Sequence, residues 1–147
     1  MPRWRNSWRL AISPTNRLRL TYLLAAIITV PVGLAVRFVP LGLPQFVVKY
    51  GGSTLWAVMV YWVLAFLWPR RTPAWLAFLA AAIAALVEFQ RLWHLPALDT
   101  FRMTLPGILL LGRFFSVWDI AAYWIAILAA ALCDTLVIRP TVGRQRG

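Results

Sequence analysis

Residues 73–93, PAWLAFLAAAIAALVEFQRLW, decide how the chain is expected to fold. Thr72 is suited to cap a helix and Pro73 to begin it, because a proline in the first turn has no hydrogen bond to lose. As a helix, the residues from Trp75 to Trp93 rise roughly 27 Å, close to the thickness of the hydrocarbon core of a bilayer. This stretch therefore predicts a transmembrane helix.

Three further apolar blocks predict three more spanning helices, near residues 20–39, 53–68 and 117–138. Of the 147 residues, 62% are hydrophobic, and a soluble fold of this composition would have too little polar surface to cover itself. Blocks that approach 20 apolar residues are typical of membrane spans. We therefore predict an all-α integral membrane protein with four transmembrane helices.

The segment between the third and fourth spans, residues 95–115, differs from the other connections. Its apolar run, GILLLG at 107–112, is too short to cross a bilayer, so the segment is expected to be re-entrant or interfacial. The linker 40–52 holds the pair Gly51–Gly52 and is expected to be non-helical or a short interfacial piece.

Arginines and prolines mark the two ends of the chain. The first part carries five arginines and an apolar stripe of Trp4, Trp8 and Ile12, which is typical of a helix lying on the headgroups. Pro14 is expected to interrupt this helix, and Pro140 is expected to end the fourth span. We predict a basic amphipathic N-terminal tail, a single transmembrane domain and a basic C-terminal tail, at residues 1–19, 20–138 and 139–147.

The formal net charge of +11 predicts how the protein lies in the membrane. Clustered Lys and Arg are typical of nucleic-acid binding, but here the basic residues lie between apolar blocks, as the positive-inside rule describes. We therefore expect membrane lipids as partners and no nucleic acid. Ten of the 15 Lys and Arg residues lie with the two termini and the loop at 70–71, which places both termini in the cytoplasm.

Polar residues gather at the end of the third span. The chain has four acidic residues and one histidine, and three of these five lie between residues 87 and 102. In the predicted topology they lie at the outer surface, near the acid that begins the fourth span. The candidate ligand-binding residues are Glu88, Arg91, His94, Asp99, Arg102, Asp119 and Tyr123.

Each of the two acids near the outer surface has two interpretations. Glu88 either forms a local ion pair with Arg91, at i+3, or points into a polar pocket shared with the segment that follows. Asp119 is favoured by the helix dipole alone, or it belongs to the same pocket, with Tyr123 at i+4 on its face. Asp134, near the cytoplasmic end, is interpreted either as a partner of Arg139 or as a snorkelling group.

We expect residues 95–115 to fold back and bring these acids together. Arg102 is then the best candidate to lie between Glu88 and Asp119, whose carboxylates are expected within about 10 Å of each other. His94 is either a ligand or an ordinary interfacial residue. One histidine and one cysteine cannot build a zinc site, so no metal and no cofactor is expected, and no nucleophile motif occurs.

This region resembles an uncharacterised family of bacterial membrane proteins, the domain of unknown function numbered 2809. The likeness covers roughly residues 20–138. The family's glutamate is followed by a glutamine, which corresponds either to Gln90 or to the position of Arg91. The matching residues are Glu88, LWH at 92–94, LD at 98–99, Arg102, LLG at 110–112, FS at 115–116, WD at 118–119 and AY at 122–123.

The chain also looks distantly like the VanZ-like families, which share an acid at the end of one span and an aspartate at the start of the next. The resemblance implies a small multi-pass protein of the bacterial inner membrane, with relatives associated with glycopeptide tolerance at the cell envelope. From the family, the resemblance carries over Glu88, His94, Asp99, Arg102, Gly112, Asp119 and Tyr123.

Three functions fit these observations, in decreasing order of support. The first is binding of a lipid headgroup or an envelope precursor by the outer-surface cluster, in which arginines pair with phosphate. The second is an accessory or structural subunit of a larger membrane protein complex, with Ala-rich and Trp-rich faces as contacts. The third is a small intramembrane enzyme that uses the same acids, although a protein without enzymatic activity is expected.

Overall fold

The computed structural model describes residues 13–40, 42, 44–90, 92, 96–110 and 116–144, and within these ranges the chain forms helices and no strand. Four helices are long and apolar enough to cross a membrane. The prediction of an all-α protein with four transmembrane helices is confirmed. The four are α1 (Pro14–Phe38), α2 (Gln45–Leu67), α3 (Pro73–Gln90) and a last one built from α6 (Val117–Cys133), the π-helix η1 (Asp134–Ile138) and α7 (Arg139–Arg144).

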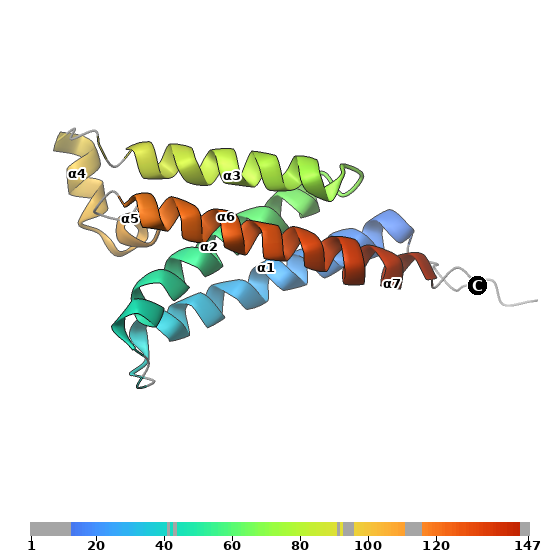
Figure 1. Ribbon diagram of the computed structural model, residues 1–147, viewed down its shortest axis with the longest axis horizontal. Coiled ribbons are helices and arrows are strands. Elements are labelled where there is room, and N and C mark those ends of the chain that lie inside the picture. The colour runs from blue at the N-terminus through green and yellow to red at the C-terminus, as the bar shows by residue number, and fades with distance from the viewer. Residues whose placement is uncertain are drawn as a thin grey trace, which may run out of the picture.

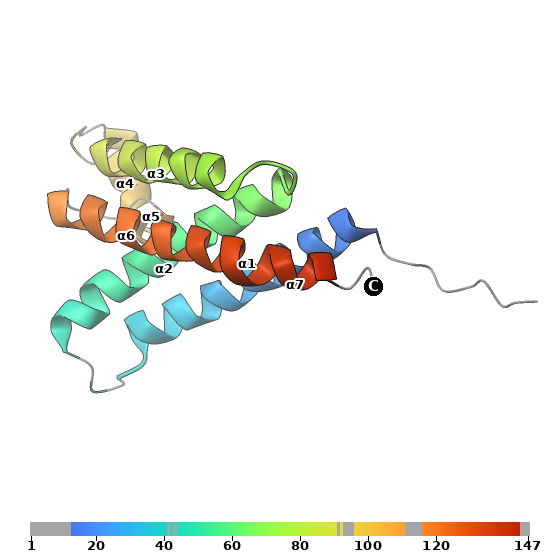
Figure 2. The ribbon, with the colours of Figure 1, turned by 45° about the vertical axis from the view of Figure 1, so that its right-hand side comes forward.

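The spanning helices form two pairs. Helix α1 packs along α2, α3 packs along α6, and α2 joins the pairs by contacting both α3 and α6. Figures 1 and 2 show the two pairs close together near α7 and splayed apart at the opposite end. We call the first end the α7 end, which also holds the turn from α2 to α3, and the second the α4 end, which also holds the connection from α1 to α2.

The segment between the third and fourth spans contains two short helices at the α4 end, α4 (Pro96–Arg102) and α5 (Leu105–Leu110) (Figure 1). A β-carbon added to Gly107 would collide with the carbonyl oxygen of Phe101, so only glycine allows the start of α5 to pack on the end of α4. Its re-entrant or interfacial place in the bilayer stays a prediction.

The first span begins at Pro14, which is the first residue of α1, where the missing N–H has no hydrogen bond to lose. The amphipathic helix that Pro14 is expected to interrupt lies outside the described residues. The hydroxyl oxygen of Ser13 caps the start of α1 by accepting from the backbone N–H of Asn16 at 3.3 Å. The predicted start of the third span is confirmed, since Thr72 Oγ1 accepts from the Trp75 N–H before α3 begins at Pro73.

Two expectations about helix ends are corrected. Residues 45–52 are not a non-helical linker, because they form the first two turns of α2, and an interfacial place for them stays a prediction. The glycines serve close packing against α1, since a β-carbon at Gly51 would lie 2.9 Å from Val36. Pro140 does not end the fourth span, which continues into α7. A proline ring normally collides with the carbonyl four residues earlier, and the wider π turn before Pro140 displaces that carbonyl.

The part of the core between α3 and the fourth span lies along two facing stripes, whereas Tyr22 of α1 and Tyr61 and Trp62 of α2 belong to the part beside them. Ala77, Ala80, Ala84 and Glu88 are buried on α3 at spacings of three and four, so the alanines allow α6 to approach closely. The facing stripe of α6 and η1 is also buried, while large side chains such as Phe78 and Leu128 point outward, as expected for a lipid-facing surface. This second stripe consists of Asp119, Tyr123, Ile127, Ala130, Ala131 and Asp134.

Candidate functional site

Glu88 joins the end of α3 to the start of α6. Its side chain is fully buried, its Oε1 accepts from the backbone N–H of Ser116 at 2.7 Å, and its Oε2 accepts from the Tyr123 hydroxyl at 3.3 Å. Ser116 is the N-cap residue of α6, and its own side chain makes no capping bond. The Glu88 carboxylate therefore caps the neighbouring helix α6. The positive end of the α6 dipole in turn stabilises the negative charge of Glu88.

Asp119 lies on the same face of α6 as the groups that bind Glu88. It follows Ser116 by three residues and precedes Tyr123 by four, and residues at these spacings share one side of a helix. Asp119 is 8% exposed. The structure thus brings the two predicted acids to one interface between α3 and α6, while the predicted separation of about 10 Å between their carboxylates stays a prediction.

Arg102 connects α4 to the end of α3. It is almost fully buried, its Nη1 donates to Asp99 Oδ1 at 2.8 Å, and its Nη2 donates to the backbone carbonyl of Gln90 at 2.7 Å. Gln90 is the last residue of α3, so the guanidinium caps the negative end of this helix. These contacts bring Arg102 and Asp99 to α3, and the expected place of Arg102 between Glu88 and Asp119 stays a prediction.

Two uncharged side chains, Gln90 at the end of α3 and Trp56 midway along α2, were not among the predicted site residues. Both polar atoms of the Gln90 amide and the indole nitrogen of Trp56 are buried without a hydrogen-bond partner in the described part of the chain. The Trp56 ring lies 6.0 Å from that of Tyr123, which binds Glu88. The family's glutamine could have pointed to Gln90, whereas nothing in the sequence distinguishes Trp56 from the other tryptophans.

We call Glu88, Asp99, Arg102, Asp119 and Tyr123, together with Gln90 and Trp56, the α4-end cluster. It contains five of the seven predicted ligand-binding residues. The other two, Arg91 and His94, lie outside the described residues, as does Gly112. Within the described ranges, no three His, Cys, Asp or Glu residues are placed to hold a metal ion.

A second buried cluster, the α7-end cluster, surrounds Asp134. Its carboxylate is fully buried and accepts from Tyr22 of α1 at 2.6 Å, from Tyr61 of α2 at 2.9 Å and from Arg139 Nε at 3.2 Å. The same guanidinium donates from Nη2 to the carbonyl of Arg71 at 2.7 Å, in the turn between α2 and α3. One carboxylate thus connects α1, α2 and the fourth span.

The π-helix explains why Asp134 and Arg139 can pair. In an α-helix, residues three or four apart face each other, and residues five apart do not. In a π-helix the hydrogen bonds join residues five apart, and the Arg139 N–H donates to the Asp134 carbonyl. Of the two interpretations of Asp134, the pairing with Arg139 is confirmed, and snorkelling is wrong because the side chain is buried.

The model of a sequence family covers the whole α4-end cluster. The model of a family described as "Protein of unknown function (DUF2809)" matches residues 42–127, more than half of the chain, and this range includes every member of the cluster. Tyr22, Asp134 and Arg139 of the α7-end cluster lie beyond it. No solved structure matches the chain.

Proposed function

The chain belongs to the DUF2809 family of proteins of unknown function, and we propose that it binds a lipid headgroup at its α4 end. The headgroup would be that of an envelope lipid or of an envelope precursor. We also propose that this multi-pass membrane protein lies in the bacterial inner membrane with its α7 end in the cytoplasm.

The observation that carries this proposal is the buried polar atoms of Gln90 and Trp56. A buried donor or acceptor without a partner costs about 1–3 kcal/mol, so native proteins bury few of them. Among the described residues, the Gln90 amide offers a donor and an acceptor, and the Trp56 indole offers a donor. A polar headgroup supplies both kinds of partner, because its oxygens accept and its hydroxyl or amine groups donate.

Charge at the same end favours a phosphate in that headgroup. The Arg102 side chain is 5% exposed, whereas that of its partner Asp99 is 43% exposed. A phosphate can therefore take the place of the Asp99 carboxylate while the guanidinium stays paired. Guanidinium and phosphate form two parallel hydrogen bonds, which makes arginine well suited to this group.

Replacing Gln90 by leucine tests the proposal. We expect the α4-end site of the variant to bind a phosphate-containing lipid at least about fivefold more weakly in mild detergent, because the change removes hydrogen bonds to the headgroup. In lipid-free detergent it should be about 1 kcal/mol more stable, since an unsatisfied amide has been removed. Mass spectrometry of bound lipid and SDS-induced unfolding measure the two effects.

Asn16→Leu is the matched control, because it removes an exposed amide at the α7 end. It should change neither quantity. Unchanged lipid in Gln90→Leu, or a loss of stability in lipid-free detergent, would contradict the proposal. Recovery of a stoichiometric membrane complex in place of lipid would favour the accessory-subunit alternative. That alternative has less structural support, because Ala77, Ala80 and Ala84 of α3 are buried inside the chain and not on its surface.

The proposed orientation is tested by cysteine labelling. In a Cys133→Ser background, Ala97→Cys should react with a membrane-impermeant thiol reagent added to intact cells, while Arg5→Cys and Gln145→Cys should react only after permeabilisation. This outcome follows from the excess of arginine at the two termini. Labelling of Gln145→Cys from outside, with Ala97→Cys protected, would reverse the orientation.

A further inference from the structure

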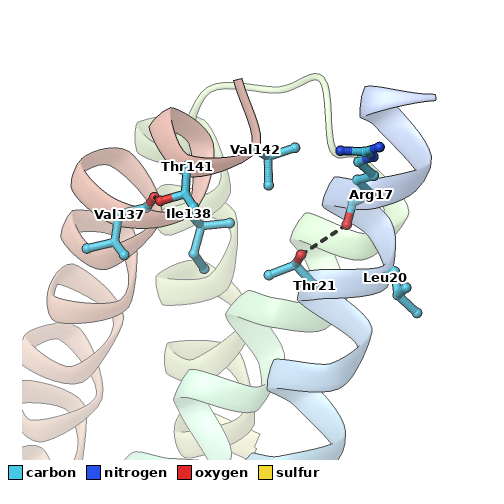
Figure 3. A pocket seen from close by; sticks show the side chains of 7 residues that line it. All are labelled: Arg17, Leu20, Thr21, Val137, Ile138, Thr141 and Val142. Carbon is cyan, nitrogen blue, oxygen red and sulfur yellow. Dashed lines mark hydrogen bonds between the residues drawn. The ribbon is translucent and has the colours of Figure 1, made fainter. Parts of the chain in front are cut away.

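A groove of about 430 Å³ lies at the α7 end between α1 and the last turns of the fourth span. Figure 3 shows Arg17 and Val142 nearest the end of the bundle, with Thr21 and Ile138 further toward its middle. None of these residues belongs to the α4-end cluster. The lining consists of Arg17, Leu20 and Thr21 of α1, Val137 and Ile138 of η1, and Thr141 and Val142 of α7.

The walls of the groove offer a ligand mainly apolar contacts. Thr21 Oγ1 donates to the carbonyl of Arg17 at 3.0 Å, and Thr141 Oγ1 donates to the carbonyl of Val137 (Figure 3). Because both hydroxyls bond to the backbone of their own helix, they have no proton left for a ligand. The other lining residues except Arg17 are aliphatic, so the groove is suited to a hydrocarbon chain.

The mouth of the groove favours a negative charge. Arg17 is the one charged residue of the lining, and Arg19, Arg71 and Arg139 lie at the same end of the bundle. Among the described residues of this end, Asp134 is the one acid, and its carboxylate is fully buried between two tyrosines and Arg139. The described charged residues of this end are therefore positive on balance, which favours an anionic occupant.

From the apolar walls and the basic mouth we infer that the groove binds an anionic phospholipid, with an acyl chain between α1 and α7 and the phosphate at Arg17. Membrane leaflets rich in anionic lipid attract basic residues by about 1 kcal/mol each. Another occupant would be the segment of residues 1–12. Its charges are Arg3, Arg5 and Arg9, which repel the mouth instead of complementing it.

Binding of dioleoyl-phosphatidylglycerol, measured by native mass spectrometry against dioleoyl-phosphatidylcholine, tests this site. Arg17→Gln should weaken binding of the anionic lipid about fivefold and leave binding of the zwitterionic lipid unchanged. Arg19→Gln is the matched control, because Arg19 is exposed on the same helix and does not line the groove. It should change binding less than twofold.

A second variant tests the acyl chain. Thr141→Phe places an aromatic ring in the groove from an exposed position and should lower binding of both lipids, while an unchanged circular dichroism spectrum shows that the fold is kept. Equal losses in Arg17→Gln and Arg19→Gln, or full binding in Thr141→Phe, would overturn the inference.

Two more variants separate this inference from its alternatives. A gain of lipid in Trp4→Ala or Trp8→Ala would also overturn the inference, because it would identify residues 1–12 as the occupant. Gln90→Leu should leave the preference for the anionic lipid unchanged, so this site and the proposed headgroup site at the α4 end can fail independently.

Discussion

Replacing Asp134 by alanine is expected to lower the free energy of unfolding by about 3–5 kcal/mol, the usual penalty for removing one partner of a buried charge pair. The change removes the acceptor of Tyr22, Tyr61 and Arg139 at once. No water reaches this position in the folded protein, because Asp134 is 0% exposed. SDS-induced unfolding in mixed micelles, followed by circular dichroism, measures the loss.

Asp99→Ala is the control for this experiment. It also removes an acid that pairs with a buried arginine, but the Asp99 side chain is 43% exposed and Arg102 keeps its hydrogen bond to the Gln90 carbonyl, so the loss should be smaller, about 1–2 kcal/mol. Tyr22→Phe and Tyr61→Phe each remove one hydrogen bond and should each cost about 1 kcal/mol. Equal losses in Asp134→Ala and Asp99→Ala would show that the α7-end cluster does not hold the helices together.

The second large effect is expected at the opposite end, where Glu88→Ala should cost about 2–4 kcal/mol of unfolding free energy. The backbone N–H of Ser116 and the hydroxyl of Tyr123 would both lose their acceptor between packed helices. The same unfolding assay detects the loss. Hydrogen exchange should show in addition that the first turn of α6 opens more often, because its cap has been removed.

Glu88→Gln separates hydrogen bonding from charge. The amide oxygen of glutamine can still accept from the Ser116 N–H, and the Tyr123 hydroxyl can turn to accept from the amide nitrogen. We therefore expect Glu88→Gln to keep most of the stability that Glu88→Ala loses. If the two variants lose equally, the charge of Glu88 carries its contribution, and the capping role described here is wrong.

Both clusters reflect how helices associate in lipid. Apolar side chains gain little by leaving lipid for the protein interior, so hydrogen bonds and close contacts between small residues decide which helix faces meet. Here Glu88 fixes α3 against α6, Asp134 fixes the fourth span against α1 and α2, and alanines fill the space between. Three of the four acidic residues of the chain are buried, and two of them, Glu88 and Asp134, serve as acceptors at opposite ends of the bundle.

The four spanning helices and the meeting of Glu88 with Asp119 could be predicted from the sequence, because the signals for both are local. Apolar block length predicts the four helices, and Thr72 with Pro73 predicts where α3 begins. Glu88 and Asp119 lie at the end and the start of adjacent spans, so any short connection brings them to the same side of the bundle. That argument needs no knowledge of how the helices rotate.

The rest depends on helix rotation and contacts across the fold, which local patterns do not contain. Tyr22 and Tyr61 are 112 and 73 residues from Asp134, and each looks like an ordinary aromatic residue of an apolar block. Gly51 looks like a helix breaker until α1 is known to pack against it. Pro140 predicts a helix end because sequence rules assume an α-helical turn before it, where the chain forms a π turn.

The π turn between Asp134 and Arg139 also decides which changes of chain length the fourth span can accept. Deleting one residue between these two would convert the π turn to an α turn, and the pair, now four apart, would still face each other, although the ring of Pro140 would then meet the carbonyl four residues before it. The same deletion between Asp119 and Asp134 would rotate one acid by about 100° relative to the other, so one cluster would lose its carboxylate. The helix thus has one short stretch where the loss of a residue keeps an acid and its arginine together at the cost of a proline clash, directly beside a stretch where the same loss separates the two clusters.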